Sequence, residues 1–358
     1  MVVSMNAFDW AKAVKEFDEA KSGVKGLVDA GITKLPRLFV HPPQSFESSP
    51  TAEQQPELPT IDFDGLRYRR PEVVEEIRRA AGEWGFFRIV NHGIPQEKMD
   101  AVLEGARRFH ELPAEEKKPL YSLDRRMPVR FNSNSALREG DPASWRDILT
   151  CAFTDDHLDP RLIPLACRRE VVEYVDHMIV VRETVAELLS EALGLPAGYL
   201  SGMECMKSQA LPCLYYPVCP EPHKTFGTPR HTDAVFLNLL LQDSTGGLQV
   251  RHGGRWVDVP PVRGALVANI GDFMQIISND KFKSVEHRAL AQRVGPRISV
   301  GCFFSPSTSA MTKPFGPIKE LVSDENPAIY KNVMFTDYIE YYKIKGEDVA
   351  SALPHFKI

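Results

Sequence analysis

The stretch that decides the fold is HTDAVFLNLLLQDSTGGLQVRHGGRWVDV, residues 231–259. It contains short apolar runs separated by Gly, Asn and Asp, and none of these runs has the length of an ordinary helix. Runs of this kind, bounded by turn residues, predict β-strands. The Gly pairs at 246–247 and 253–254 suit hairpins of a double-sheet jelly roll, an architecture that encloses a cavity between its sheets.

The same pattern continues downstream, where apolar runs at 265–270 and 298–304 predict further strands. Upstream of the all-β region the chain alternates between strand and helix signals. The predicted strands are 60–63 and 85–91, and the predicted helices are 71–83, 96–112 and 168–193.

We therefore predict a mostly β protein with flanking helices. Its centre is a double-stranded β-helix, or jelly-roll, core that follows an N-terminal α/β module. Apolar residues at helical spacing predict one amphipathic helix over 7–28, and a Pro- and Ser-rich arm follows at 41–58. The expected divisions are 1–58 (helix and arm), 59–200 (α/β module with a long support helix), 201–310 (jelly-roll core) and 311–358 (C-terminal segment and helix).

Composition excludes several classes of protein. The 48 acidic and 43 basic residues are mixed along the chain, and the net charge of −5 leaves no broad basic surface, so we expect no nucleic-acid partner. No apolar run approaches the roughly 18 residues that a membrane crossing needs. The six cysteines form no C-x-x-C pair and no secretory signal is present, which predicts reduced thiols and a cytoplasmic location. We also expect a monomer.

Two histidines and one carboxylate form the facial triad of non-haem iron(II) oxygenases, because three protein ligands leave three positions for a cosubstrate and O2. His231 and Asp233 are two residues apart, and positions i and i+2 of a strand point to the same side. The candidate third ligand is His287, at the end of the run 281–287, which we interpret as a strand.

A second H-x-D triplet, His157-Leu-Asp159, lies among other acidic residues with no strand signal after it. We predict that it is part of a surface loop.

Arg297 and Ser299 follow ten residues after His287, two apart in an apolar run. A guanidinium and a hydroxyl on one side of a strand can clamp a carboxylate, and Arg stays charged when buried. Burial of Arg297 without an anionic partner would be costly. The pair therefore favours a dicarboxylate cosubstrate.

Taken together, these residues resemble the plant 2-oxoglutarate-dependent dioxygenases. The H-x-D, the distal His and the R-x-S of that family match His231-Thr-Asp233, His287 and Arg297-Ile-Ser299, with Tyr215-Tyr-Pro217 upstream. Within the family, the stretches 17–28, 145–147 and 316–320 are similar to the 1-aminocyclopropane-1-carboxylate oxidase homologues. Several members of that subgroup hydroxylate alkaloids or benzoxazinoid glucosides.

The resemblance implies a cofactor set and a site. Fe(II) would be held by His231, Asp233 and His287, with 2-oxoglutarate and O2 as cosubstrates and ascorbate as reductant. Arg297 and Ser299 would bind the far carboxylate of 2-oxoglutarate, and Tyr216 would add a hydrogen bond. One departure is Leu214, where many relatives have Asn. By family position, the substrate pocket would be lined by Phe131, Asn132, Trp145 and Phe303.

The expected reaction is hydroxylation of a small plant specialised metabolite, with release of succinate and CO2. Ring closure, desaturation and O-demethylation stay open, since they use the same residues and differ in substrate pose. Less favoured are the reaction of 1-aminocyclopropane-1-carboxylate oxidase itself, which does not use 2-oxoglutarate, and a non-catalytic small-molecule sensor, which would need no iron triad.

Overall fold

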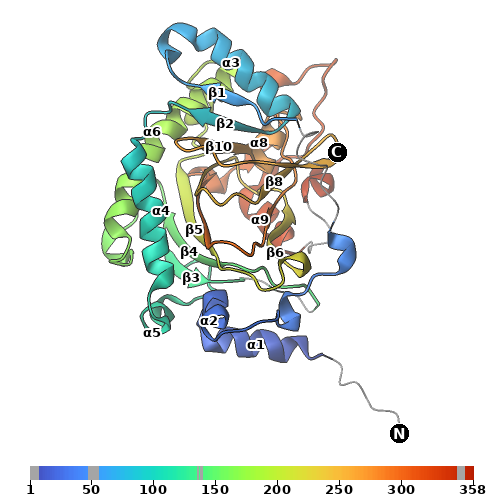
Figure 1. Ribbon diagram of the computed structural model, residues 1–358. Coiled ribbons are helices and arrows are strands. Elements are labelled where there is room, and N and C mark those ends of the chain that lie inside the picture. Colours follow the sequence, from blue (N-terminus) through green and yellow to red (C-terminus); the bar gives the residue numbers. More distant parts are fainter. Residues whose placement is uncertain (1–7, 47–55, 135–136, 138–139, 345–350) are drawn as a thin grey trace.

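The structure is a computed structural model that describes residues 8–46, 56–134, 137, 140–344 and 351–358. Within these residues, eight strands form one sheet in the order β1-β2-β10-β7-β12-β5-β4-β3, and four form a second in the order β6-β11-β8-β9 (Figure 1). The larger sheet consists of β1 Thr60–Asp62, β2 Phe86–Val90, β3 Val129–Asn132, β4 Asp147–Phe153, β5 Ser208–Tyr216, β7 Leu237–Gln242, β10 Leu266–Ile270 and β12 Arg297–Ser305. The smaller sheet consists of β6 Phe226–His231, β8 Leu248–His252, β9 Arg255–Asp258 and β11 His287–Leu290.

Side chains of the two sheets pack against each other. Leu248 and Val257 of the smaller sheet share a buried cluster with Phe86 and Val267 of the larger one. Because the sheets meet through such contacts, they form a sandwich whose inner faces can line a cavity. This is the jelly-roll core that the sequence predicts.

The core strands predicted from the apolar runs are confirmed, but only one of the two glycine breaks is a hairpin. Gly253-Gly254 is the turn between β8 and β9, where His252 lies opposite Arg255. At Gly246-Gly247 the chain instead crosses from β7 in the larger sheet to β8 in the smaller one, so the hairpin predicted there is wrong. Glycine marks a sharp change of direction, but it does not say which strand the chain pairs with next.

Alternation along the strands sorts the residues of the larger sheet between two faces. One row in register across four strands lies in the main hydrophobic cluster on the outer, helix-covered face: Phe131, Leu149, Cys213 and Val300. The adjacent row is on the inner face: Asn132, Ile148, Leu214 and Ser299. This sorting decides which side chains can reach the cavity.

Three helices cover one side of the larger sheet (Figure 1). They are α3 Leu66–Glu83, α4 Gln96–Glu111 and α6 Arg168–Ala192. All three were predicted. The helix predicted over 71–83 is present, and α3 also contains an additional turn from Leu66, separated from it by the non-helical residue Arg69, two residues before Pro71. The proline ring does not fit a regular helix interior, so the helix is kinked there. The remaining elements are α5 Ala114–Lys117, α7 Tyr199–Gly202, α8 Asp272–Ile277, α9 Phe335–Ile344, and the small sheet of β13 Pro314–Phe315 and β14 Val333–Met334.

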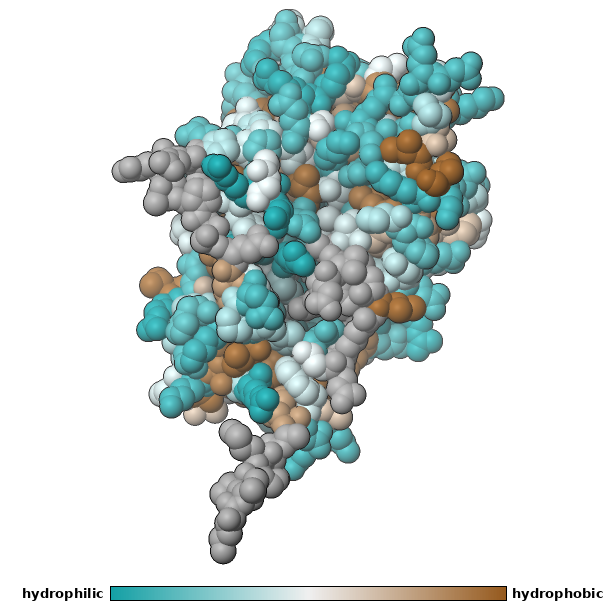
Figure 2. Space-filling model, turned by 90° about the vertical axis from the view of Figure 1, so that its right-hand side faces the viewer, coloured by the Kyte–Doolittle hydropathy of each residue, from teal (hydrophilic) through white to brown (hydrophobic). Residues whose placement is uncertain are grey.

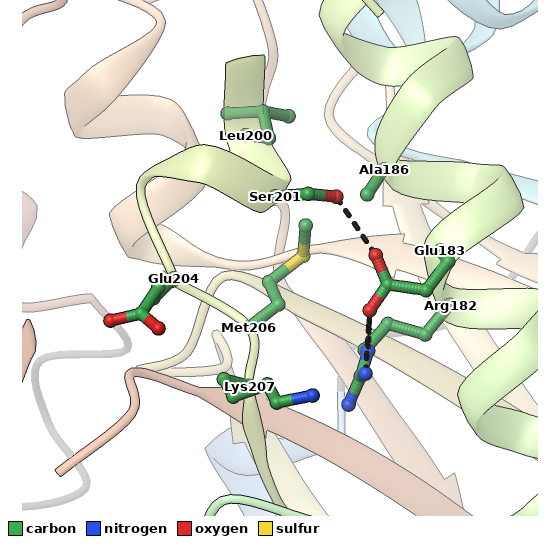
Figure 3. Close-up of a pocket in the computed structure, with 8 residues that line it drawn as sticks. All are labelled: Arg182, Glu183, Ala186, Leu200, Ser201, Glu204, Met206 and Lys207. Carbon is green, nitrogen blue, oxygen red and sulfur yellow. Dashed lines mark hydrogen bonds and ion pairs between the residues drawn. The ribbon is translucent and has the colours of Figure 1, made fainter. Parts of the chain in front are cut away.

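An ion network around the buried Arg182 joins α6 to the turn after β4 and, through the pair of Asp156 with Lys207, to the residue before β5 (Figure 3). The guanidinium of Arg182, whose side chain is 2% exposed, pairs with Asp156 at 2.5 Å and with Glu183 at 2.6 Å. Ser201 donates to Glu183, as the close-up shows. The adjoining cavity has a volume of about 20 Å³, room for a single water. The network therefore links these segments of the fold. The cavity beside it is too small to admit an organic substrate.

The N-terminal segment contains two helices, α1 Trp10–Ala20 and α2 Gly23–Asp29, so the single helix predicted over 7–28 is wrong. The chain turns at Lys21 and Gly23, which have φ of 51° and 69°, and a left-handed backbone ends a helix. Residues 1–7 and 47–55 of the predicted helix and arm lie outside the described residues.

The N-terminal helices pack on the end of the sandwich, at the lower edge of the molecule in Figure 1. Val24 and Phe39 share a cluster with Trp145, Cys219 and Ala291. These three residues flank strands of both sheets, so the N-terminal segment covers one end of the barrel.

On the face drawn in Figure 2, hydrophobic residues form separate patches in a mostly hydrophilic surface. The predicted monomer stays a prediction. None of the described helices combines the length and the apolar composition that a membrane crossing requires. All six cysteines are free thiols.

Candidate active site

The two candidate histidine ligands lie on neighbouring strands of the smaller sheet. His231 is the last residue of β6 and His287 the first of β11, and the two are paired in the antiparallel register. The prediction that residues 281–287 form a strand is wrong, because only His287 belongs to one. Asp233 likewise lies in the loop after β6, not on a strand. Strand alternation therefore does not explain how His231 and Asp233 come to share a side.

The three side chains nevertheless converge. One ligand atom from each of His231, Asp233 and His287 lies within 4.8 Å of the others, and no other such group of three or more occurs in the described part of the chain. Asp233 Oδ1 is 3.5 Å from His231 Nε2 and 3.6 Å from His287 Nε2. The Nδ1 atoms of the two rings face the carbonyls of Pro229 and Val285, which leaves both Nε2 atoms turned to the carboxylate. An outer hydrogen bond of this kind orients a metal-binding imidazole.

Two asparagines fix the carboxylate. Asn269 Nδ2 donates to Asp233 Oδ2 at 2.7 Å and Asn238 Nδ2 does so at 3.3 Å, so Oδ1 is the oxygen that faces the histidines. Burial alone would raise the pKa of Asp233, but His287, His231 and Asn269 hold it well below its usual range.

Burial, with a further contribution from His231, lowers the pKa of His287 to about 4. A neutral imidazole beside an ionised carboxylate is the protonation state that metal binding requires.

Side chains of α8 and α9 hold the loop that carries Asp233. Thr232 donates to the buried carboxylate of Asp272, which also accepts a hydrogen bond from Tyr338 at 2.7 Å. Tyr342 of α9 donates to the carbonyl of Thr232. The C-terminal helix predicted within 311–358 thus supports the loop between β6 and β7, although residues 345–350 lie outside the described part.

Arg297 and Ser299 lie on the inner face of β12, as their spacing predicts. Arg297 is 2% exposed and donates to Ser299 Oγ at 3.1 Å, to Gln242 Oε1 at 3.0 Å and to the carbonyl of Gly246 at 2.6 Å. No carboxylate of the described residues pairs with it. A buried guanidinium with only neutral partners favours binding of an anion.

Tyr216 lies directly beside this guanidinium. It is opposite Arg297 in the strand register, and the guanidinium carbon is 4.7 Å from its ring centre. Its hydroxyl is 3.3 Å from Thr228 Oγ1 on the other sheet. Burial by itself would raise the pKa of Tyr216, but the charges of Arg297 and Arg146 lower it below the ordinary phenol value. The hydroxyl is thus a good hydrogen-bond donor to an anion.

The four predicted substrate-pocket residues separate into two pairs. Asn132 shares the inner row with Ser299, and Phe303 is on the same face of β12 as Arg297 and Ser299. Phe131 faces the outer side and packs against Phe109 of α4, with a ring-centre distance of 5.8 Å.

Trp145 is completely buried in the N-terminal cluster, where its indole donates to the carbonyl of Pro217. The structure thus places Phe131 and Trp145 outside the cavity, because their backbone positions turn the side chains away from it. The resemblance to the family did not indicate to which side of the sheet these two side chains point.

The other H-x-D triplet does not form a cluster. Asp159 pairs with Arg161 at 2.7 Å on the surface, and His157 closes a short turn with Thr154. The surface loop predicted there is confirmed.

The comparisons with known proteins agree with this geometry. The profile of the 2OG-Fe(II) oxygenase superfamily matches residues 207–306, and the profile for the N-terminal region of non-haem dioxygenases in morphine synthesis matches residues 58–166. 1-Aminocyclopropane-1-carboxylate oxidase homolog 1 of Arabidopsis thaliana is 46% identical, over 98% of each chain. The chain belongs to this oxygenase superfamily. Within it, the protein is a plant-type 2-oxoglutarate-dependent dioxygenase of the 1-aminocyclopropane-1-carboxylate oxidase-like subgroup.

Further relatives give the activity its class. Deacetoxyvindoline 4-hydroxylase of Catharanthus roseus is 44% identical, over 97% of this chain and 89% of the relative. The crystal structure of JOX2 in complex with 2OG, Fe and JA is similar with a TM-score of 0.80 and 29% identity, covering 94% of this chain and 97% of the other. The oxygenase is therefore an Fe(II)- and 2-oxoglutarate-dependent enzyme that uses O2 as cosubstrate.

Sequence reasoning missed the residues that support the site. Asn269 and Asp272 interrupt the long apolar stretch 264–277, and an amide or carboxylate in such a stretch must find partners when buried. That interruption was an available signal. Asn238 interrupts the apolar run 234–241 in the same way. No comparable signal marks Tyr342.

Proposed function

We propose that the oxygenase holds Fe(II) with His231, Asp233 and His287 and hydroxylates a small organic molecule of plant specialised metabolism. The observation that carries this assignment is the convergence of the three ligand atoms within 4.8 Å in the jelly-roll core. Two imidazoles and one carboxylate are the donor set of 2-oxoglutarate oxygenases. Bound Fe(II) with 2-oxoglutarate supplies O2 activation coupled to decarboxylation of the cosubstrate to succinate and CO2.

The chain's own residues position the reactants. Arg297 and Ser299 bind the far carboxylate of 2-oxoglutarate, and Tyr216 donates a further hydrogen bond. Asn269 and Asn238 keep one oxygen of Asp233 occupied, so that its other oxygen is left for the metal. Asn132 and Phe303 line the substrate side of the inner face. Phe131 and Trp145 are left out of this pocket because they pack elsewhere.

Hydroxylation is the outcome that the relatives favour, since one at 44% identity is a 4-hydroxylase. Ascorbate would serve as the reductant. Six free buried thiols fit a reducing compartment such as the cytoplasm, and we expect the enzyme to act as a monomer.

The test compares substitutions in the two H-x-D triplets. His231→Ala and Asp233→Ala should each weaken Fe(II) binding in anaerobic titration by at least tenfold and abolish succinate release. His157→Ala and Asp159→Ala, in the surface triplet, are matched controls and should change neither. If the site variants bind Fe(II) as tightly as the unmodified chain does, the ligand assignment is refuted.

Product analysis separates the alternatives. Mass spectrometry of plant metabolites incubated with Fe(II), ascorbate and 2-oxoglutarate should show a gain of one oxygen atom. Loss of two hydrogens would instead indicate desaturation or ring closure, and loss of a methyl group would indicate O-demethylation. Product formation without any need for 2-oxoglutarate would indicate chemistry of the 1-aminocyclopropane-1-carboxylate oxidase type.

A further inference from the structure

A second guanidinium lies inside the barrel. In the pairing of β4 with β5, Asp147 is opposite Tyr215, so Arg146 falls opposite Tyr216, which is in turn opposite Arg297. Arg146 Nη1 donates to Thr228 Oγ1 on β6 of the smaller sheet. Arg146 therefore spans the space between the two sheets, on the other side of Tyr216 from Arg297.

Its two neighbours in the sequence fix this direction. Trp145 packs edge-on against Phe39, with a ring-centre distance of 5.1 Å, and Asp147 accepts hydrogen bonds from the backbone of Val24 and Lys25. Both neighbours are thus fastened to the N-terminal segment. Since successive residues of an extended chain point to opposite sides, Arg146 is turned to the cavity.

The charge of Arg146 has no counter-ion within the described residues. Its one hydrogen bond is to the neutral hydroxyl of Thr228, no carboxylate is within ion-pair distance, and its buried Nε has no partner. A cation in this position is costly unless an anion reaches it. With Nη1 engaged, the remaining Nε–Nη2 edge is the fork that matches the two oxygens of a carboxylate.

The free carboxylate of 2-oxoglutarate can pair with only one of the two guanidinium groups, Arg297 or Arg146. 2-Oxoglutarate uses one carboxylate for the metal, and its other carboxylate is matched by Arg297 with Ser299. We infer that Arg146 binds a carboxylate of the organic substrate, so that the oxygenase acts on a carboxylic acid. This inference rests on the proposed function and adds a substrate class to it.

The test measures ligand binding by calorimetry under anaerobic conditions, on protein saturated with Fe(II) and 2-oxoglutarate. The probes are three cyclic acids, indole-3-acetate, jasmonate and cinnamate, each compared with its neutral primary amide. The unmodified protein should bind at least one acid tenfold or more tightly than the amide. Arg146→Gln should weaken binding of that acid about tenfold and leave the affinity for the amide unchanged. Arg146→Lys, which keeps the positive charge, should weaken binding of the acid by less.

Two controls show whether Arg146 binds the carboxylate of the substrate or a carboxylate of 2-oxoglutarate. Arg126→Gln, a change to a side chain that is 91% exposed, should leave all affinities unaltered. The affinity of Arg146→Gln for 2-oxoglutarate should stay within threefold of the original, which also shows that the variant is folded. A tenfold loss of 2-oxoglutarate binding would assign Arg146 to the cosubstrate and overturn the inference.

Two further outcomes would overturn it: no acid is preferred over its amide, or Arg146→Gln binds the preferred acid as well as the unmodified protein does. Failure of the proposed iron site is distinguishable, because the unmodified protein would then not bind Fe(II) and 2-oxoglutarate, and failure of hydroxylation shows in the product mass.

Discussion

Arg297 is 2% exposed, and its N–H groups meet a hydroxyl, an amide oxygen and a backbone carbonyl. Each of these partners is neutral, so the positive charge is stabilised by dipoles alone until an anion enters. Leu214 lies opposite Ser299 in the strand register. Its apolar side chain offers no hydrogen bond, so in the proposed site the far carboxylate of 2-oxoglutarate is left to Arg297, Ser299 and Tyr216.

Arg297→Ala should raise the KM for 2-oxoglutarate by roughly tenfold to a hundredfold, the loss expected when a charge-assisted pair is removed. The kcat at saturating 2-oxoglutarate should change much less, because the metal ligands are untouched. Steady-state succinate release at varied 2-oxoglutarate measures both constants. Arg126→Ala is the matched surface control, and an unchanged KM in Arg297→Ala would refute the assignment.

At the scale of single residues, the sequence singled out the two histidines and the carboxylate that converge in the structure, and the neighbouring Arg297 and Ser299, because those residue types are rare in combination and have distinctive spacing. It did not predict Asn238 and Asn269, which hold Asp233. Each asparagine comes from a different strand, and only the pairing of β7 with β10 places them side by side, with Asn238 opposite Asn269.

At the scale of elements, β4 connects the N-terminal helices to the active site. Asp147 is fully buried and accepts hydrogen bonds from Val24 N at 2.7 Å, from Lys25 N at 2.8 Å and from the hydroxyl of Ser133. Its carboxylate therefore caps the start of α2 although it lies 123 residues further along the chain than Val24. A negative charge at a helix N-terminus is favourable.

Asp147→Asn should destabilise the protein by about 2–4 kcal/mol, because a charged acceptor of several buried hydrogen bonds is replaced by a group that is half donor. The loss of stability should be largest in the N-terminal segment. Limited proteolysis with mass spectrometry should show faster cleavage within residues 8–46 than in the unmodified protein. Asp159→Asn, on the surface, is the control. Equal cleavage rates for Asp147→Asn and the unmodified chain would contradict this role.

Most elements could be predicted from apolar periodicity, but their ends and connections could not. Asp233 lies in a loop and His287 at the start of a strand because hydrogen bonds between strands, not the local pattern, set where each strand ends. The N-terminal helix was predicted as one because its apolar spacing continues across Lys21, where the backbone turns.

At the scale of the whole molecule, buried histidines couple stability to pH. Burial lowers the pKa of His110 to about 3, although a hydrogen bond with the carbonyl of Cys213 opposes the shift. Burial likewise lowers the pKa of His41 to about 4. In the unfolded chain both rings take up a proton near pH 6.5. The unfolded state thus binds more protons than the folded state between these values, and stability falls as the pH drops through this window.

The free energy of unfolding of the metal-free protein should therefore decrease from pH 6.5 towards pH 4. Each such histidine contributes a slope of up to about 1.4 kcal/mol per pH unit. His110→Gln should reduce the total slope by about that amount, and His223→Gln, at an exposed position, should not. Urea unfolding followed by circular dichroism at several pH values measures this. If the plots of unfolding free energy against pH are parallel for His110→Gln and the unmodified protein, His110 does not take up a proton on unfolding.

The sequence by itself determined the jelly-roll class, the two histidines and one carboxylate, and the Arg297-Ser299 pair, because apolar period and residue chemistry are local properties. Only the tertiary structure decided which face of each strand meets the cavity. It excluded Phe131 and Trp145 from the pocket, brought Asn269 to Asp233 and turned Arg146 inward. Those outcomes depend on strand register, which is set by hydrogen bonds and packing between segments far apart in the chain.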